Sequence, residues 1–214
     1  LENMRFIVHD VAGRACLSLA SLLLFGKRPQ DTLYYARISA VRWRGNEAGE
    51  HIIDRQEVIG RLPEQIEHAT AFIELNTRLT TIIDDVQQTD RPQYPRPVLR
   101  EAIVNAVAHR DYSITGAQIL LYVFDNRVEI RSPGGLPNTV TLANVRTHYS
   151  KARNETIARV LFNLGYVNSL GSGIPRMIRL MREHVGRDPE FEVIGRGIEG
   201  QQFLVRLWGE PLAL

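Results

Sequence analysis

The polar side chains best suited to chemistry lie in residues 100–112, R-E-A-I-V-N-A-V-A-H-R-D-Y. Glu101 and Asn105 are four residues apart, so on a helix they lie one turn apart on the same side. An asparagine oxygen can bind Mg²⁺, a hard cation that keeps water ligands and shares substrate phosphates. A glutamate one turn earlier can orient or deprotonate a water. The alternative is a solvated polar face that ends in the charged residues 109–111.

Two glycine turns follow this segment. Residues 132–137, S-P-G-G-L-P, come after an expected strand, where glycine lets the backbone approach a ligand closely. Residues 170–176, L-G-S-G-I-P-R, precede an expected helix, whose first N–H groups attract phosphate. In this order the three segments predict a nucleotide pocket. The alternatives are an ordinary strand-ending turn and a helix capped by Ser172 or Gly173.

Other candidate sites are weaker. Asp125 and Asn126 favour a hairpin turn over a ligand site, because both residue types suit tight turns. His9, His148 and His184 have no partner at the spacing of a zinc site. We therefore expect no zinc.

Composition is that of an ordinary globular protein, with 214 residues, 44% hydrophobic and 23% charged. A net charge of +2 is too small to indicate a nucleic-acid or membrane surface. The single Cys16 excludes an internal disulfide and a cysteine metal cluster, and it fits a reducing cytoplasm. The apolar run 17–25 is too short to span a bilayer. Residues 1–3 carry no strong start signal, so we expect part of a longer protein.

The elements that must position these residues fall into two halves, 1–94 and 95–214. Their expected junction is the proline-rich segment 89–97, T-D-R-P-Q-Y-P-R-P, a linker or an extended crossing. In the first half the patterns predict helices at 18–25 and 62–78 and strands at 36–43, 50–59 and 79–86. In the second half they predict helices at 98–109, 155–164 and 174–184 and strands at 118–124, 127–131, 191–194 and 202–207.

Helix 98–109 has an apolar stripe that should face a sheet, formed by Leu99, Ala102, Ile103, Ala106 and Val107. Glu101 and Asn105 then lie on the opposite face. Helices packed on a mixed sheet make the fold class α+β. The expected architecture is a small α/β connecting domain followed by a two-layer α/β sandwich.

Four segments together resemble the GHKL ATPase superfamily, the gyrase, histidine kinase and MutL type. They are E-A-I-V-N-A-V-A-H-R-D-Y (101–112), F-D-N-R-V-E-I-R-S-P-G-G-L-P (124–137), S-K-A-R-N-E-T-I-A-R-V-L (150–161) and L-G-S-G-I-P-R-M (170–177). The resemblance is closer to a divergent branch of bacterial and archaeal proteins that are labelled as transcriptional regulators and as RecG-related. The first half is similar to the segment that follows a Schlafen-type AlbA domain in that branch.

The resemblance implies roles for individual residues. Asn105 takes the place of the Mg²⁺-binding asparagine and Glu101 that of the general base. His109 falls near the nucleotide, and Gly134 matches the adenine-binding turn. The implied phosphate-binding group is Gly171 and Gly173, with Lys151 and Arg153 as further contacts from a lid at 138–170.

One position departs from the superfamily pattern. Ser132 or its immediate neighbour stands where an aspartate usually accepts a hydrogen bond from adenine, and a neutral hydroxyl is a weaker acceptor than a carboxylate. The expected function is an ATP- and Mg²⁺-binding module of a cytoplasmic, DNA-binding transcriptional regulator. ATP hydrolysis and a homodimer stay open, and DNA is expected to bind through other domains. The rival is a nucleotide-free interaction or dimerisation module.

Overall fold

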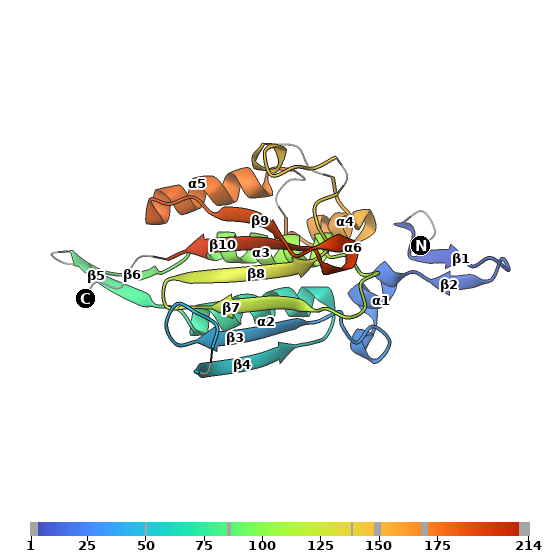
Figure 1. The fold of residues 1–214 in the computed structure, drawn as a ribbon, viewed down its shortest axis with the longest axis horizontal. Helices are drawn as coiled ribbons and strands as arrows, with labels where there is room; N and C mark the ends of the chain where they lie inside the picture. Colours follow the sequence, from blue (N-terminus) through green and yellow to red (C-terminus); the bar gives the residue numbers. More distant parts are fainter. Residues whose placement is uncertain are drawn as a thin grey trace.

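The computed structural model describes residues 4–49, 51–84, 87–137, 139–147, 151–167 and 171–209. Its centre is a six-stranded sheet in the order β4-β3-β7-β8-β10-β9 (Figure 1). The strands are β3 (Ile38–Trp43), β4 (Ile52–Val58), β7 (Ile119–Val123), β8 (Arg127–Pro133), β9 (Glu190–Ile194) and β10 (Gln202–Trp208). Two hairpins extend from opposite ends of the molecule, β1 (Ile7–His9) with β2 (Ala15–Leu17), and β5 (Leu79–Asp84) with β6 (Gln87–Pro92).

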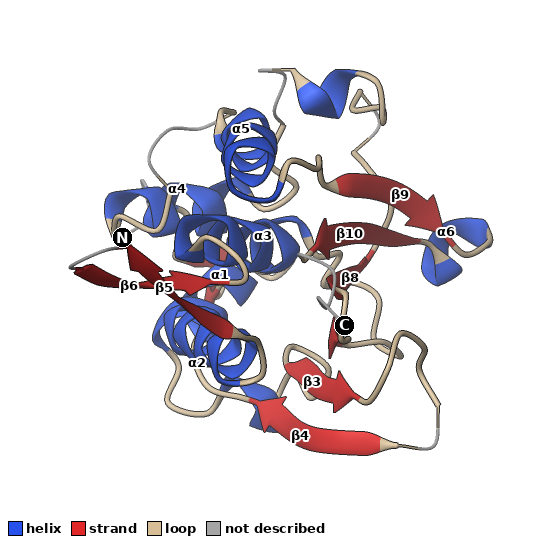
Figure 2. Ribbon diagram, turned by 90° about the vertical axis from the view of Figure 1, so that its left-hand side faces the viewer, coloured by secondary structure: helices blue, strands red, loops and turns tan. Residues whose placement is uncertain are grey.

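The long helices lie on one face of this sheet (Figure 2). The helices are α1 (Leu19–Phe25), α2 (Leu62–Leu75), α3 (Arg96–His109), α4 (Glu155–Asn163), α5 (Gly173–Val185) and the short α6 (Gly197–Gly200), with 3-10 turns η2 (Pro29–Asp31) and η3 (Asn144–Arg146). The predicted α+β class, with helices packed on a mixed sheet, is confirmed. No described helix combines the length and apolar character needed to cross a membrane.

Local signals explain why the predicted helices form where they do. The Ser18 side chain accepts a hydrogen bond from the Ser21 N–H and caps α1. Helix α2 begins with Pro63 in its first turn and buries the apolar residues that predicted it, Ile66, Ala69, Phe72 and Ile73. Helix α3 begins two residues earlier than predicted, because Pro97 occupies its first turn, where no N–H partner is needed.

The proline-rich segment is only partly as expected. Its extended conformation is confirmed as far as Pro92, the last residue of β6. The segment is not a free linker, because Tyr94 is 2% exposed and Arg96 and Pro97 already belong to α3. The prolines lie at the end of a strand and at the start of a helix. Both positions tolerate the missing backbone N–H of proline.

The sheet joins strands from both halves of the sequence. Strand β3 pairs in parallel with β7, from Ile38 opposite Ile119 to Arg42 opposite Val123. All other pairings in this sheet are antiparallel, including β3 with β4 and β7 with β8. The division at residue 94 stays a prediction, although the two parts share one hydrogen-bonded sheet.

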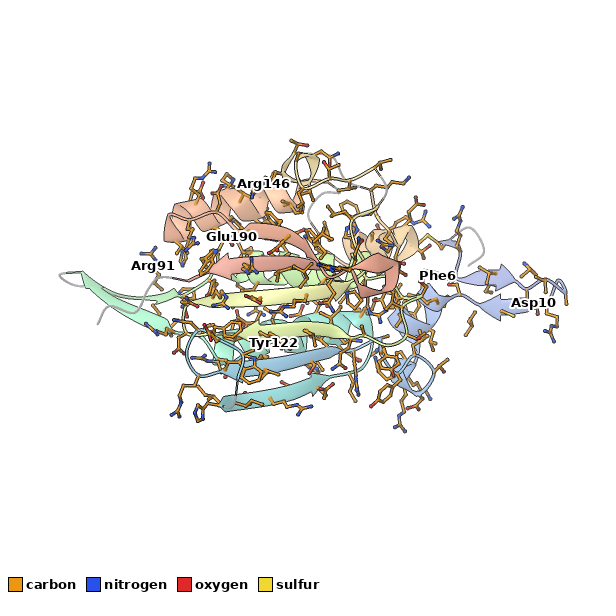
Figure 3. All side chains as sticks on the ribbon, in the orientation of Figure 1. Phe6, Asp10, Arg91, Tyr122, Arg146 and Glu190 are labelled. Atoms are coloured by element: carbon orange, nitrogen blue, oxygen red, sulfur yellow. The ribbon has the colours of Figure 1, made fainter. Side chains whose placement is uncertain are left out.

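The face of the sheet opposite the long helices carries a charged cluster around Glu129. On β8, Val128, Ile130 and Ser132 point to the helices, so Glu129 points the other way. Its carboxylate accepts hydrogen bonds from Arg127 at 2.7 Å, Arg131 at 2.7 Å and Arg206 at 3.2 Å. Burial alone raises the pKa of Glu129, but Arg131 and Arg127 outweigh it and hold the pKa below its usual value. Figure 3 shows the side chains along these strands, with Tyr122 of β7 and Glu190 of β9 labelled.

Glu129→Gln should therefore destabilise the protein at pH 7. Hydrogen bonds to a charged group contribute about 1.5–3 kcal/mol, and we expect a loss of that order in the free energy of unfolding. A carboxylate with a lowered pKa stabilises the fold above its unfolded-state pKa, and this contribution is lost as pH falls through the folded-state pKa. The gap between wild type and variant should shrink below about pH 4.5. Urea unfolding at several pH values measures it.

The matched control is Glu192→Gln, because Glu192 is an exposed carboxylate that also pairs with Arg206. Exposed ion pairs contribute at most about 1 kcal/mol. Equal losses for the two variants would contradict the assigned importance of the Glu129 cluster.

Candidate functional site

Helix α3 is covered on both of its sides. Its apolar stripe is buried as predicted, and the helix contacts β8, α2, α4 and α5. Glu101 lies on the other face, yet it is only 6% exposed, because the start of α5 covers it. The alternative of a fully solvated polar face is therefore wrong at Glu101.

Glu101 and Asn105 form a hydrogen-bonded pair, as their spacing predicts. The Asn105 Nδ2 donates to Glu101 Oε1 at 3.3 Å. With its NH₂ group turned to Glu101, the Asn105 amide leaves Oδ1 without a hydrogen bond from any described residue. Burial raises the pKa of Glu101, and the bond from Asn105 and the charge of Arg176 offset only part of this effect. A carboxylate with a raised pKa is suited to accept a proton nearer neutral pH.

Gly173, the first residue of α5, lies directly against Glu101. A Cβ built at position 173 would be 1.9 Å from Glu101 Oε1, far inside van der Waals contact. Glycine is therefore the residue that lets α5 begin this close to the carboxylate. The positive end of the helix dipole then faces a negative group, a favourable arrangement.

Ser132 and Gly134 form the second wall of the site, where β8 ends. The Ser132 hydroxyl donates to the Ala106 carbonyl of α3 at 2.8 Å, which ties β8 to the helix. Gly134 has a φ of +100°, in the region that favours glycine. A Cβ there would be 2.7 Å from the Cβ of Asp111, so the turn packs tightly on the end of α3.

The residues after α3 connect to this turn. The Asp111 N–H donates to the Pro133 carbonyl at 2.8 Å. Arg153 forms an ion pair with the Asp111 carboxylate at 2.9 Å and donates to the Gly135 carbonyl at 2.6 Å. Burial, together with the charge of Arg153, lowers the pKa of His109 to about 4. His109 is therefore neutral at pH 7.

Most of the residues predicted for the site line one hollow: Glu101, Asn105, His109, Ser132, Gly134, Lys151, Gly171 and Gly173. The hollow has a cavity volume of about 110 Å³ and is partly open to solvent. The structure thus brings residues from α3, β8, the 151–154 segment and the start of α5 to one place.

Sequence reasoning missed two parts of this hollow. Its apolar lining includes Leu136 of the S-P-G-G-L-P turn, and also Val145 and Phe203, which no motif indicated. Arg153 was expected to contact phosphate, but it is bound to Asp111 and Gly135. Lys151 is exposed and lies at the hollow. Of the expected lid, 138–170, residues 138, 148–150 and 168–170 lie outside the described part, so His148 is not placed.

The donor set at the hollow fits Mg²⁺ shared with a phosphate ligand. Among the described residues, no group of three or more His, Cys, Asp and Glu side chains could hold a metal ion by itself. Asn105 Oδ1 and the Glu101 carboxylate are oxygen donors of the kind that Mg²⁺ takes, and Mg²⁺ ordinarily completes its sphere with waters and phosphate oxygens.

Gly173→Ala tests the contact between α5 and Glu101. Helix propensity alone would make alanine more favourable by about 1 kcal/mol. The clash with Glu101 should reverse the sign and lower the free energy of unfolding by about 1–3 kcal/mol. Adding Glu101→Ala should recover part of this loss, which a double-mutant cycle measures by urea unfolding. Gly116→Ala, where a Cβ meets no atom within 4 Å, is the control; a stabilised Gly173→Ala would refute the contact.

His109 predicts a pH dependence of stability. The folded protein keeps His109 neutral down to about pH 4, whereas the unfolded chain protonates near pH 6.5. The free energy of unfolding should therefore fall as pH drops from 6.5 to 4, by at most about 3 kcal/mol. His109→Gln should flatten this slope in urea titrations, with the surface variant His51→Gln as comparison. An unchanged slope in His109→Gln would show that His109 does not cause it.

Comparison with known proteins identifies a related domain. Residues 116–206 match the family described as "Putative ATP-dependent DNA helicase recG C-terminal". The match supports a divergent ATPase-like domain in this part of the chain. It begins after α3, so Glu101 and Asn105 precede the matched residues.

A solved structure has the same fold. The DIP2311 protein from Corynebacterium diphtheriae is similar with a TM-score of 0.76 and 26% sequence identity over 95% of this chain. This chain spans 39% of the length of that protein. No curated protein matches the sequence.

Proposed function

We propose that this chain is a nucleotide-binding module that takes ATP with Mg²⁺ in the hollow between α3, β8 and α5. The observation that carries the proposal is the convergence of Glu101, Asn105, Ser132 and Gly134 on that hollow. The match of residues 116–206 to an ATPase-like family also supports it, and that match does not depend on Glu101 or Asn105.

Ser132 and Gly134 form the end of the hollow that suits the base. The Ser132 proton is committed to the Ala106 carbonyl, so the hydroxyl lone pairs can accept a hydrogen bond from an adenine amino group. Gly134 has no Cβ to block a flat ring, and Leu136, Val145 and Phe203 supply apolar surface. A neutral hydroxyl binds the amino group more weakly than a carboxylate does, so modest affinity follows.

Asn105, Lys151 and the start of α5 form the end that suits the phosphates. We assign Asn105 Oδ1 to Mg²⁺, and Lys151, which lines the same hollow, brings a positive charge to it. The first N–H groups of α5, next to Gly171 and Gly173, add a favourable dipole. When bound, Mg²⁺ neutralises phosphate charge and orients the phosphate chain.

Glu101 is the residue we assign to hydrolysis. Its buried carboxylate has a raised pKa and is fixed by Asn105, so it can orient a water and accept its proton. We propose that ATP hydrolysis is slow, and that the Glu101 carboxylate acts on the water and does not contact the nucleotide.

The role in the cell is also a proposal. A cytoplasmic transcriptional regulator, which binds DNA through other domains and can form a homodimer, is what the sequence resemblance implies. Ser132 in place of a carboxylate favours a second function, a nucleotide-free interaction module with the same fold. Nucleotide binding separates the two.

Asn105→Ala should abolish Mg²⁺-dependent ATP binding, because it removes the side-chain oxygen assigned to the metal. Calorimetric titration with ATP, with and without Mg²⁺, measures it. Asn163→Ala, an exposed asparagine at the end of α4, is the matched control and should bind as wild type does. Equal affinity for wild type and Asn105→Ala would refute the metal assignment. Absence of heat for wild type at millimolar ATP would favour the interaction module.

Glu101→Gln separates binding from hydrolysis. The amide keeps the size of the side chain but cannot accept the proton, so binding should persist while any phosphate release falls by 10²-fold or more, the usual order for a general base. Turnover that survives in Glu101→Gln would remove Glu101 from this role.

A further inference from the structure

Two consecutive residues, Arg153 and Asn154, hold together the parts of the site that come from different elements. We call this pair the latch. It lies immediately after Lys151 and Ala152, which line the hollow, and immediately before α4. The sequence resemblance implies a phosphate contact for Arg153 and no role for Asn154.

Arg153 joins the end of α3 to the glycine turn. Its Nη1 donates to Asp111 Oδ2 at 2.9 Å and its Nη2 donates to the Gly135 carbonyl at 2.6 Å. The side chains of Arg153 and Asp111 are 26% and 20% exposed, so the ion pair is largely shielded from water. The other carboxylate oxygen of Asp111 accepts hydrogen bonds from the N–H and hydroxyl of Ser113, which fixes the acceptor.

Asn154 binds the C-terminal end of α3. Its Nδ2 donates to the Ala108 carbonyl at 2.9 Å and to the Arg110 carbonyl at 2.8 Å. The last carbonyls of a helix have no partner within the helix, so this side chain supplies what the helix lacks. Both latch residues therefore bind the segment that carries His109.

The packing shows why the latch acts on the hollow itself. A Cβ at Gly134 would meet Asp111 at 2.7 Å and the Arg153 guanidinium at 3.5 Å. The ion pair thus lies directly against the turn whose other side faces the hollow. A shift of Arg153 would move Gly134 and Gly135 on one side and Lys151 on the other.

We propose that Arg153 and Asn154 are positioning residues for the nucleotide site. They hold the Gly134–Gly135 turn against the end of α3, and they keep Lys151 at the hollow. This inference rests on the proposed function for its ligand, Mg·ATP. Neither latch residue needs to touch the nucleotide, which distinguishes this role from the phosphate contact expected of Arg153.

The test compares Arg153→Gln, Arg153→Lys and Asp111→Asn with Arg159→Gln, a nearby exposed arginine on α4. Calorimetry gives the Kd for Mg·ATP, and hydrogen exchange without nucleotide reports on residues 134–137. We expect Arg153→Gln to weaken binding about tenfold, the loss of one charge-assisted contact, and to speed exchange in the turn. A lysine ammonium cannot bind both the Asp111 carboxylate and the Gly135 carbonyl as the planar guanidinium does. Arg153→Lys should therefore retain only part of the wild-type affinity for Mg·ATP.

Two further variants test the ion pair and the role of Asn154. Asp111→Asn combined with Arg153→Gln should weaken binding no more than Arg153→Gln alone, because Arg153→Gln already removes the ion pair. Asn154→Ala should speed exchange in the turn through the end of α3. Arg159→Gln should behave as wild type in both measurements.

The outcomes are distinguishable. Lower thermal stability in Arg153→Gln with an unchanged Kd and unchanged exchange in the turn would overturn the positioning role and leave only a contribution to stability. Absence of heat for wild type would overturn the proposed nucleotide, not the latch. In that case faster exchange in Arg153→Gln than in Arg159→Gln supports the latch, and equal exchange overturns it.

Discussion

Helix α3 has to bury two chemically different faces at once, and the other parts of the site are arranged around that constraint. Its apolar stripe packs on the sheet, a strongly favourable burial. The opposite face carries Glu101, and an unpaired buried carboxylate would cost several kcal/mol. Asn105 and the start of α5 reduce this cost by a hydrogen bond and a favourable dipole. The close approach of α5 then requires glycine at position 173.

The same arrangement explains why chemistry and stability are coupled here. The groups proposed to act on a ligand are also those that hold elements together: Glu101 contacts α5, and Ser132 binds the backbone of α3. A raised carboxylate pKa and a lowered histidine pKa both follow from burial in one small region. Groups with perturbed pKa values that gather at a hollow are typical of an active site.

Much of the fold could be predicted because local signals were strong. The Asp125-Asn126 turn between two apolar runs defined the β7–β8 hairpin, and the spacing of Ile66, Ala69 and Ile73 defined α2. Glu101 and Asn105 could be paired because helix geometry relates residues four apart. The parallel pairing of β3 with β7 could not be predicted, because side-chain alternation does not encode which strand lies alongside. The β1–β2 hairpin, with three residues a strand, is too short for a periodic signal.

The parallel pairing of β3 with β7 has a consequence for the order in which the molecule can form during synthesis. Strands β3 and β4 can meet as soon as residue 58 is made, but a two-stranded hairpin is at best marginally stable in water. The other neighbour of β3 is β7, which is not complete until residue 123. Until then the backbone N–H and C=O groups on one edge of β3 have no strand to pair with, because their partner lies far along the chain. Completion of the sheet is therefore a late, long-range event, of the kind that slows folding.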